Sequence, residues 1–161
     1  LHNNEFGSAG IQALFEGLGC GSAPSLRYLS LGGNLFGPVG ARALAAALRR
    51  GSMPKLEILH LTGNPIGMED DCVATLAAPL RKLPLKRLIL FKNDIGDEGA
   101  KAIGEALLVN AVLTKLWLHN NSIGNVGAAA IAEALKVNGS LTKLWLYNNK
   151  IGDAGGTALA A

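Results

Sequence analysis

The 161-residue chain has only two cysteines, few charges and no long uninterrupted apolar stretch. Cys20 and Cys72 are too few for a disulfide framework, and no charged, apolar leader opens the sequence. Charged residues make up 17% of the chain and apolar residues 49%, which excludes a disordered tail. The sequence contains no run of about 18 apolar residues, so we expect no membrane-spanning helix. We therefore expect a folded, soluble protein in the cytoplasm, with no membrane partner.

The chain also lacks a strong excess of charge of one sign. Fifteen Lys and Arg residues against twelve Asp and Glu give a net charge of +3. This bias is too weak for a protein whose whole surface neutralises phosphates. Any basic site must therefore be local.

What the sequence does contain is an internal repeat, which must be identified before individual elements are assigned. Leu113 to Asn121 reads LTKLWLHNN and Leu141 to Asn149 reads LTKLWLYNN, so the two segments differ at one position only. The same L-x-x-L-x-L-x-x-N frame begins at Leu85, Leu56 and Leu26, at successive offsets of 28, 29 and 30 residues.

Each copy joins a segment of period two to a segment with helical period. Leu116 and Leu118 flank Trp117 in the alternation of a short strand. The spacing i, i+3, i+4, i+7 of one helix face follows, at Ala128, Ile131, Ala132 and Leu135. Strands pack at about 4.8 Å and helices at about 8 to 10 Å, so the strands take the inner side of the stack. The predicted fold class is α/β, a right-handed solenoid or horseshoe with a concave parallel sheet and convex helices.

Three finer features follow from the same frame. The crowded helix contacts require small side chains, which the alanines supply. The asparagine that ends each strand frame is expected to bond freed backbone groups and to stack into a ladder. The third copy carries two additional residues between Asn64 and Leu76, and Pro79 follows, so we expect a bulged or frayed helix there.

We expect residues 1–161 to form a single repeat domain. Six copies are visible, of which the first, at Leu1 to Asn4, and the last, which stops at Ala161, are truncated. Because solenoids normally end in caps with a polar outer face, a fragment of a longer array is expected.

The chain resembles the ribonuclease-inhibitor-like class of leucine-rich repeats. The strand frame carries this resemblance together with N-x-I-G-x-x-G-A-x-x-I-x-x-x-L, which runs from Asn93 to Leu107 and from Asn121 to Leu135. Ribonuclease inhibitor, the nucleotide-binding innate immune receptors and the Ran GTPase-activating protein contain such arrays. The resemblance implies an intracellular horseshoe that binds macromolecules, but it does not name the partner.

Side chains between the strand leucines are expected to point into the concave hollow. The last three strands gather cations and aromatic rings there. The predicted partner-binding residues are Arg87, Phe91, Lys115, Trp117, His119, Lys143, Trp145 and Tyr147. Such rings expose more apolar area than a monomer usually leaves in one patch, and Trp, Tyr and Arg are enriched in binding hot spots. We therefore predict a non-enzymatic scaffold or sensing arm that binds a protein with an acidic or mixed surface.

Three alternatives to this interpretation stay open. The rings can simply stabilise adjacent strands. By resemblance to the Ran activator, the array can assist a GTPase, although the sequence offers no nucleophile or acid–base pair of its own and implies no cofactor. Nucleic-acid binding, the least favoured, would use Arg87, Lys92, Lys115 and Lys143 with tryptophan stacking. The oligomeric state is left open.

Metal binding is not predicted. His2, His60 and His119 are expected on strands far apart, without other ligands at a suitable spacing. Cys20 and Cys72 belong to copies two steps apart and are expected to be free thiols. The acidic run Glu69 to Asp71 is expected to be solvated.

Overall fold

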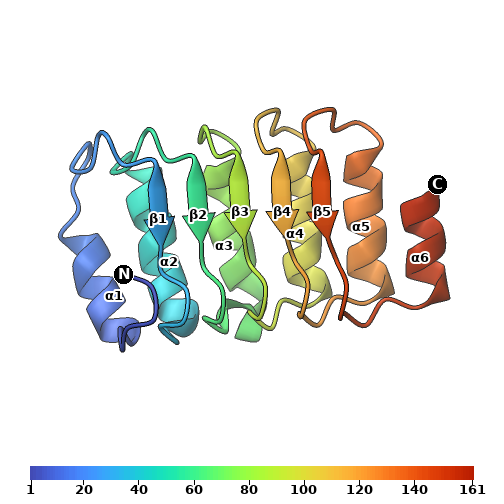
Figure 1. The fold of residues 1–161 in the computed structure, drawn as a ribbon, viewed down its shortest axis with the longest axis horizontal. Helices are drawn as coiled ribbons and strands as arrows, with labels where there is room; N and C mark the ends of the chain where they lie inside the picture. The colour runs from blue at the N-terminus through green and yellow to red at the C-terminus, as the bar shows by residue number, and fades with distance from the viewer.

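The computed structural model describes residues 1–161, which form a five-stranded parallel sheet with helices along one of its faces (Figure 1). The strands lie side by side in sequence order and are β1 (Tyr28–Ser30), β2 (Ile58–His60), β3 (Arg87–Ile89), β4 (Lys115–Trp117) and β5 (Lys143–Trp145). The helices are α1 (Ser8–Glu16), α2 (Gly37–Arg49), α3 (Asp70–Leu80), α4 (Asp97–Leu107), α5 (Asn125–Leu135) and α6 (Asp153–Ala160). A 3-10 helix, η1 (Ile66–Met68), precedes α3. The predicted α/β solenoid is confirmed. None of its helices combines the length and apolarity that crossing a bilayer requires.

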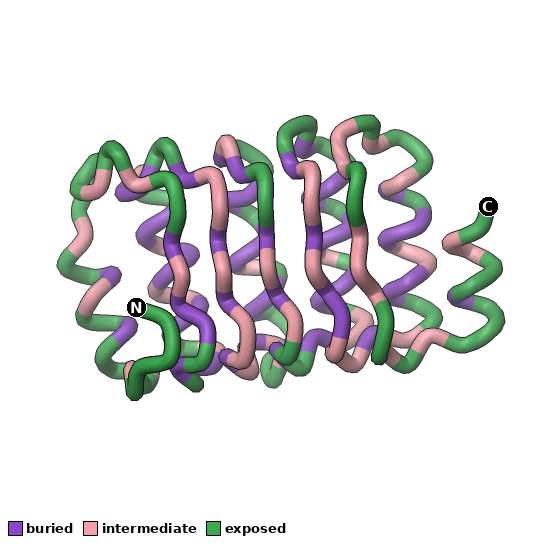
Figure 2. Tube along the Cα trace, viewed as in Figure 1, coloured by how far each residue is buried: buried purple, intermediate pink, exposed green.

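Equivalent frame positions pair across the sheet. Leu59 pairs with Leu88, and Leu88 pairs with Leu116. These leucines are fully buried against the helices, and Figure 2 shows buried segments recurring at the same level of successive strands. Because strand side chains alternate, the residues between the leucines lie on the other face of the sheet. We call that face, which is turned away from the helices, the concave face.

A single core of 35 buried apolar residues fills the space between the sheet and the helices. Small residues line the helix contacts, as predicted, and Gly104 of α4 is one example. A Cβ atom there would lie 2.9 Å from the carbonyl oxygen of Ala130 on α5. Only glycine therefore allows these two helices to approach so closely.

The asparagine ladder predicted at the strand ends is present. Asn64 is fully buried, and its Oδ1 accepts the backbone N–H of Asn34 at 3.2 Å. Its Nδ2 donates to the carbonyls of Leu31 at 2.9 Å and Leu61 at 3.0 Å. The same role falls to Asn34, Asn93, Asn121 and Asn149. Each amide thus joins its own copy to a neighbouring one.

A second ladder, which sequence reasoning missed, lies in the loops that return to the strands. Asn110 accepts the backbone N–H groups of Val112 and Leu113 through Oδ1 and donates to the carbonyl of Leu80 at 2.8 Å. Asn138 occupies the equivalent place one copy later. Its offset of 28 residues from Asn110 was the available signal.

The first residue of a helix caps the next helix along the stack. Asp97 opens α4, and its Oδ1 accepts the backbone N–H groups of Gly124 at 2.7 Å and Gly127 at 2.8 Å, at the start of α5. Asn125 does the same for α6. A cap of this kind satisfies N–H groups that a helix cannot bond internally, and here it also holds two copies in register.

The additional residues of the third copy do not bulge or fray its helix, so that prediction is wrong. They are taken up before the helix by η1 and by Glu69, whose backbone is extended at φ −123° and ψ 127°. Helix α3 is then continuous, with Pro79 in its last turn. The acidic run is also not simply solvated, because Arg42 pairs with Glu69 and, at 2.8 Å, with Asp71.

Candidate functional site

Two rows of stacked rings run across the concave face. Trp117 and Trp145 pair in register on β4 and β5, and their rings stack with centroids 4.3 Å apart and an interplanar angle of 8°. Phe91, His119 and Tyr147 stack two residues further along the chain, at 4.4 and 4.3 Å. Both tryptophans are half-buried and Tyr147 is 55% exposed, so the two rows remain accessible from the concave side.

His119 differs from the other predicted binding residues because it is only 7% exposed. It lies between Phe91 and Tyr147, and its Nδ1 atom is buried without a hydrogen-bond partner. Burial, and secondarily the charge of Lys92, lower the pKa of His119, so the neutral ring is favoured. His119 therefore serves mainly as the middle ring of the stack.

A row of cations runs parallel to the rings. Arg87, Lys115 and Lys143 pair in register on β3, β4 and β5. Arg87 and Lys143 are exposed and Lys115 is half-buried, and none of the three forms an ion pair. Like charges directly opposite each other are destabilising, so this row weakens the sheet and favours an anionic group against it. All eight predicted binding residues thus lie on β3 to β5 or two residues beyond each strand.

Two neighbouring cations, by contrast, share a carboxylate partner. Glu57 contacts Arg27 on one side and Lys86, at 2.9 Å, on the other. The hydrogen bond from Lys86, followed by that from Arg27, lowers the pKa of Glu57 and keeps it ionised. Arg27 and Lys86 are therefore held by a carboxylate, whereas Arg87, Lys115 and Lys143 are not.

The expectation that the histidines lie far apart is wrong for His2 and His60, whose rings stack with centroids 5.1 Å apart. Gly32 leaves room for the His2 ring, because a Cβ atom there would lie 2.6 Å from Nδ1 of His2. Ser30 Oγ lies 3.3 and 3.4 Å from the two Nδ1 atoms. Burial, then His2, lower the pKa of His60. No cluster of three or more His, Cys, Asp or Glu side chains with metal-site geometry forms in the chain.

The two cysteines are free, as predicted. Cys20 is exposed in a loop, whereas Cys72 is buried in α3. Burial raises the pKa of the Cys72 thiol to about 11. Because the thiolate is the reactive form, Cys72 is poorly suited to act as a nucleophile.

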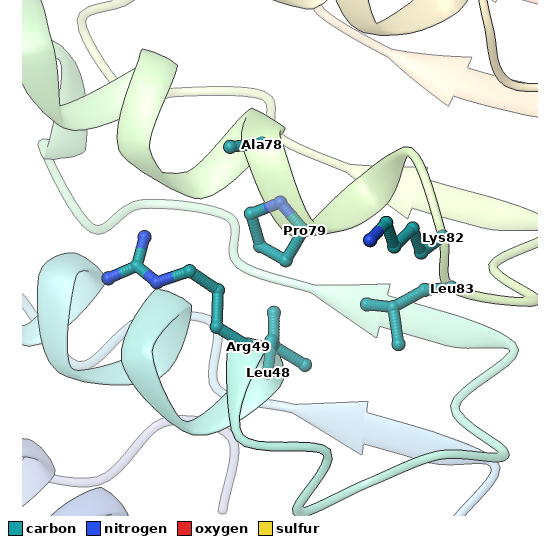
Figure 3. A pocket seen from close by; sticks show the side chains of 6 residues that line it. All are labelled: Leu48, Arg49, Ala78, Pro79, Lys82 and Leu83. Atoms are coloured by element: carbon teal, nitrogen blue, oxygen red, sulfur yellow. The ribbon is translucent and has the colours of Figure 1, made fainter.

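A cleft of about 380 Å³ opens between the C-terminal ends of α2 and α3 (Figure 3). Its walls are Leu48, Arg49, Ala78, Pro79, Lys82 and Leu83. Arg49 lies in the last turn of α2, and Lys82 follows α3, where a cation complements the negative end of the helix dipole. These two charges therefore have a structural role, and the cleft has no acid–base pair for catalysis.

Acid is expected to destabilise the fold through His60 and His119. Because burial lowers the pKa values of His60 and His119, the unfolded chain binds more protons as the pH falls below about 6.5. The contribution of these two neutral rings to stability is complete above that pH and is lost as the pH falls through their folded-state pKa values. His119→Phe keeps the ring stack and removes one titrating group, so its thermal midpoint should fall less between about pH 7.5 and 5.

Thermal melts followed by circular dichroism across this range test the effect. The matched control is Tyr147→Phe, which alters the neighbouring ring but no histidine. An equal fall in the midpoint for His119→Phe and the unsubstituted chain would contradict the assignment.

The sequence matches a family described as Leucine Rich repeat over more than half of its length. The matched residues are 22–45, 52–69, 82–104, 109–132 and 137–160. A search of curated protein sequences finds no match.

Solved structures share the fold. Leiomodin-1 actin-binding site 2 superposes with a TM-score of 0.63 at 22% identity, over 74% of this chain and 68% of that one. The tropomodulin C-terminal domain from Caenorhabditis elegans also gives 0.63, at 14% identity, over 74% of this chain and 72% of that one. An internalin from Listeria monocytogenes gives 0.51 at 20% identity, over 99% of this chain and 45% of that one. At these identities the likeness establishes the fold alone.

Proposed function

We propose that this chain, which belongs to the leucine-rich repeat family, is a non-enzymatic interaction module that binds a protein partner on the concave face of β3 to β5. The observation that carries the proposal is the in-register tryptophan pair, Trp117 and Trp145, beside a row of cations without carboxylate partners. Accessible aromatic rings flanked by charge are the composition of a binding hot spot. Solenoid repeats present extended concave surfaces of this kind for recognition.

The proposal also includes the ribonuclease-inhibitor-like class and an intracellular setting. The α-helix that follows each of the five strands supports the class. Two free cysteines support the setting, since exported domains of this size more often oxidise their cysteines in pairs.

The double substitution Trp117→Ala with Trp145→Ala tests the proposed surface. We expect it to lower the amount of partner retained on the immobilised protein at least about tenfold, because hot-spot truncations commonly weaken binding by 2 kcal/mol or more. Circular dichroism should show the fold retained, since both side chains lie on the solvent side of the sheet. Retention is measured by quantitative co-precipitation.

The matched control is Tyr28→Ala, which removes a 54% exposed ring from β1, at the start of the same sheet. This control should retain the partner fully. Undiminished retention by the folded double variant would place the binding surface elsewhere.

A further inference from the structure

The candidate surface is built in parallel rows that cross the strands and follow the axis of the solenoid. The cation row contains Arg87, Lys115 and Lys143, and the tryptophan pair lies two residues further along its strands. Neighbours within a row are about 4.8 Å apart, and the two rows are separated by about 6.7 Å. A partner segment that contacts a whole row must therefore run along the solenoid axis, perpendicular to the strands.

The charges of the surface specify one side of that segment. Every member of the cation row lacks an ion pair, whereas Arg27 and Lys86 share Glu57. Repulsion within the row is relieved by carboxylates placed at the same spacing. The partner should therefore carry several acidic side chains in a line, with an apolar strip beside them for the tryptophans.

The spacing of the cation row favours a helix over a strand. Three cations span about 9.6 Å, in two steps of about 4.8 Å. Residues i, i+3 and i+7 of an α-helix share one face and are displaced by about 4.5 and 10.5 Å along its axis. Same-face residues of a strand recur at about 6.7 Å, so a strand along this axis would be out of register with the cations after one step. A helix about 10 to 12 Å in diameter also covers both rows at once.

We propose that the partner presents an amphipathic α-helix along the solenoid axis, with an acidic stripe against Arg87, Lys115 and Lys143 and an apolar stripe on the Trp117–Trp145 pair. This inference rests on the proposed function of the concave face and adds the chemistry of the partner.

Intrinsic tryptophan fluorescence detects binding at this surface, because the only two tryptophans of the chain are Trp117 and Trp145. The probes are two tryptophan-free synthetic peptides of about 18 residues with identical composition. One places Glu at i, i+3, i+7 and i+10 beside a stripe of Leu, and the other permutes the same residues so that no stripe forms. In titrations followed by tryptophan fluorescence, the striped peptide should bind with at least tenfold higher affinity than the permuted peptide. Added salt should weaken its binding.

Charge reversal supplies the second arm of the experiment. Lys115→Glu with Lys143→Glu should lower the affinity for the striped peptide at least tenfold, and a peptide with Lys in place of Glu should restore it. The matched control is Lys101→Glu on α4, an exposed cation on the helical side, which should leave the affinity unchanged. Thermal melts confirm that each variant is folded.

Three results would overturn the inference. Equal binding of the permuted peptide would show that charge alone acts, without helical geometry. Tighter binding of a single-stranded oligothymidylate than of the striped peptide would assign the surface to nucleic acid. If neither peptide changes the fluorescence while partner retention still depends on the tryptophans, the helix inference fails and the proposed function stands. Loss of that dependence would instead refute the proposed function itself.

Discussion

Asn64→Ala is expected to lower the free energy of unfolding by about 3 to 5 kcal/mol, because it leaves two buried backbone N–H groups without an acceptor and removes one donor from each of two buried carbonyls. The side chain is 0% exposed, and its Oδ1 accepts the N–H groups of Asn34 at 3.2 Å and Phe36 at 3.4 Å. Its Nδ2 donates to the carbonyls of Leu31 and Leu61, which keep Asn34 and Asn93 as further donors. Each orphaned group contributes about 1 to 3 kcal/mol of lost stability. Alanine keeps the backbone conformation available but cannot replace any of these bonds.

The matched control is Asn149→Ala, which removes the equivalent amide from the strand at the end of the sheet. Asn149 makes the same kinds of bonds, to Ile123, Leu118 and Leu146, but it is only half-buried. Water can take over those bonds, so we expect a loss of about 1 to 2 kcal/mol. Urea denaturation followed by circular dichroism measures both values. Equal losses would show that burial does not set the strength of the ladder.

Gly67→Ala should lower the free energy of unfolding by about 2 to 3 kcal/mol through overpacking. Gly67 lies in η1, and a Cβ atom there would stand 2.5 Å from the carbonyl oxygen of Asp94 and 2.6 Å from the backbone nitrogen of Ile95. The Ile95 side chain is fully buried, which prevents that segment from moving aside. The N–H of Gly67 also donates to the carbonyl of Asn93 at 2.8 Å, and the shift would strain this bond.

Gly139→Ala is the control for this prediction, because a Cβ atom at Gly139 meets nothing within 4 Å. Its effect should stay within about 0.5 kcal/mol, as for an ordinary surface substitution. The same urea titration compares the two variants. A loss for Gly67→Ala no larger than that for Gly139→Ala would mean that the third copy can shift away from the fourth at little cost.

Most of the architecture was predictable because it repeats. The recurring leucine frame indicated the strands and their buried face, and the spacing of small and apolar residues indicated the helices. The asparagine ladder followed from one residue at a constant offset. Prediction failed where one copy departs from the others, since local pattern could not show that η1 and Glu69 absorb the additional residues ahead of a regular α3.

The candidate site was predictable only as a set of columns. Alternation placed the rings and cations on one face, but it could not show that His119 is almost completely covered by its neighbours. It also missed the stacking of His2 on His60, which depends on the missing side chain of Gly32. Ring stacking depends on neighbours from other copies, which alternation within one strand does not describe.

The sequence by itself determined which residues form strands and helices and which face of each is apolar, because those properties arise from neighbours a few positions apart. The tertiary structure alone decided which side chains meet between copies. It brought Asp97 to the start of α5, paired Arg42 with the acidic run and left the cation row without ion pairs. These contacts depend on the distance between residues about one repeat apart, which is set only when the copies stack.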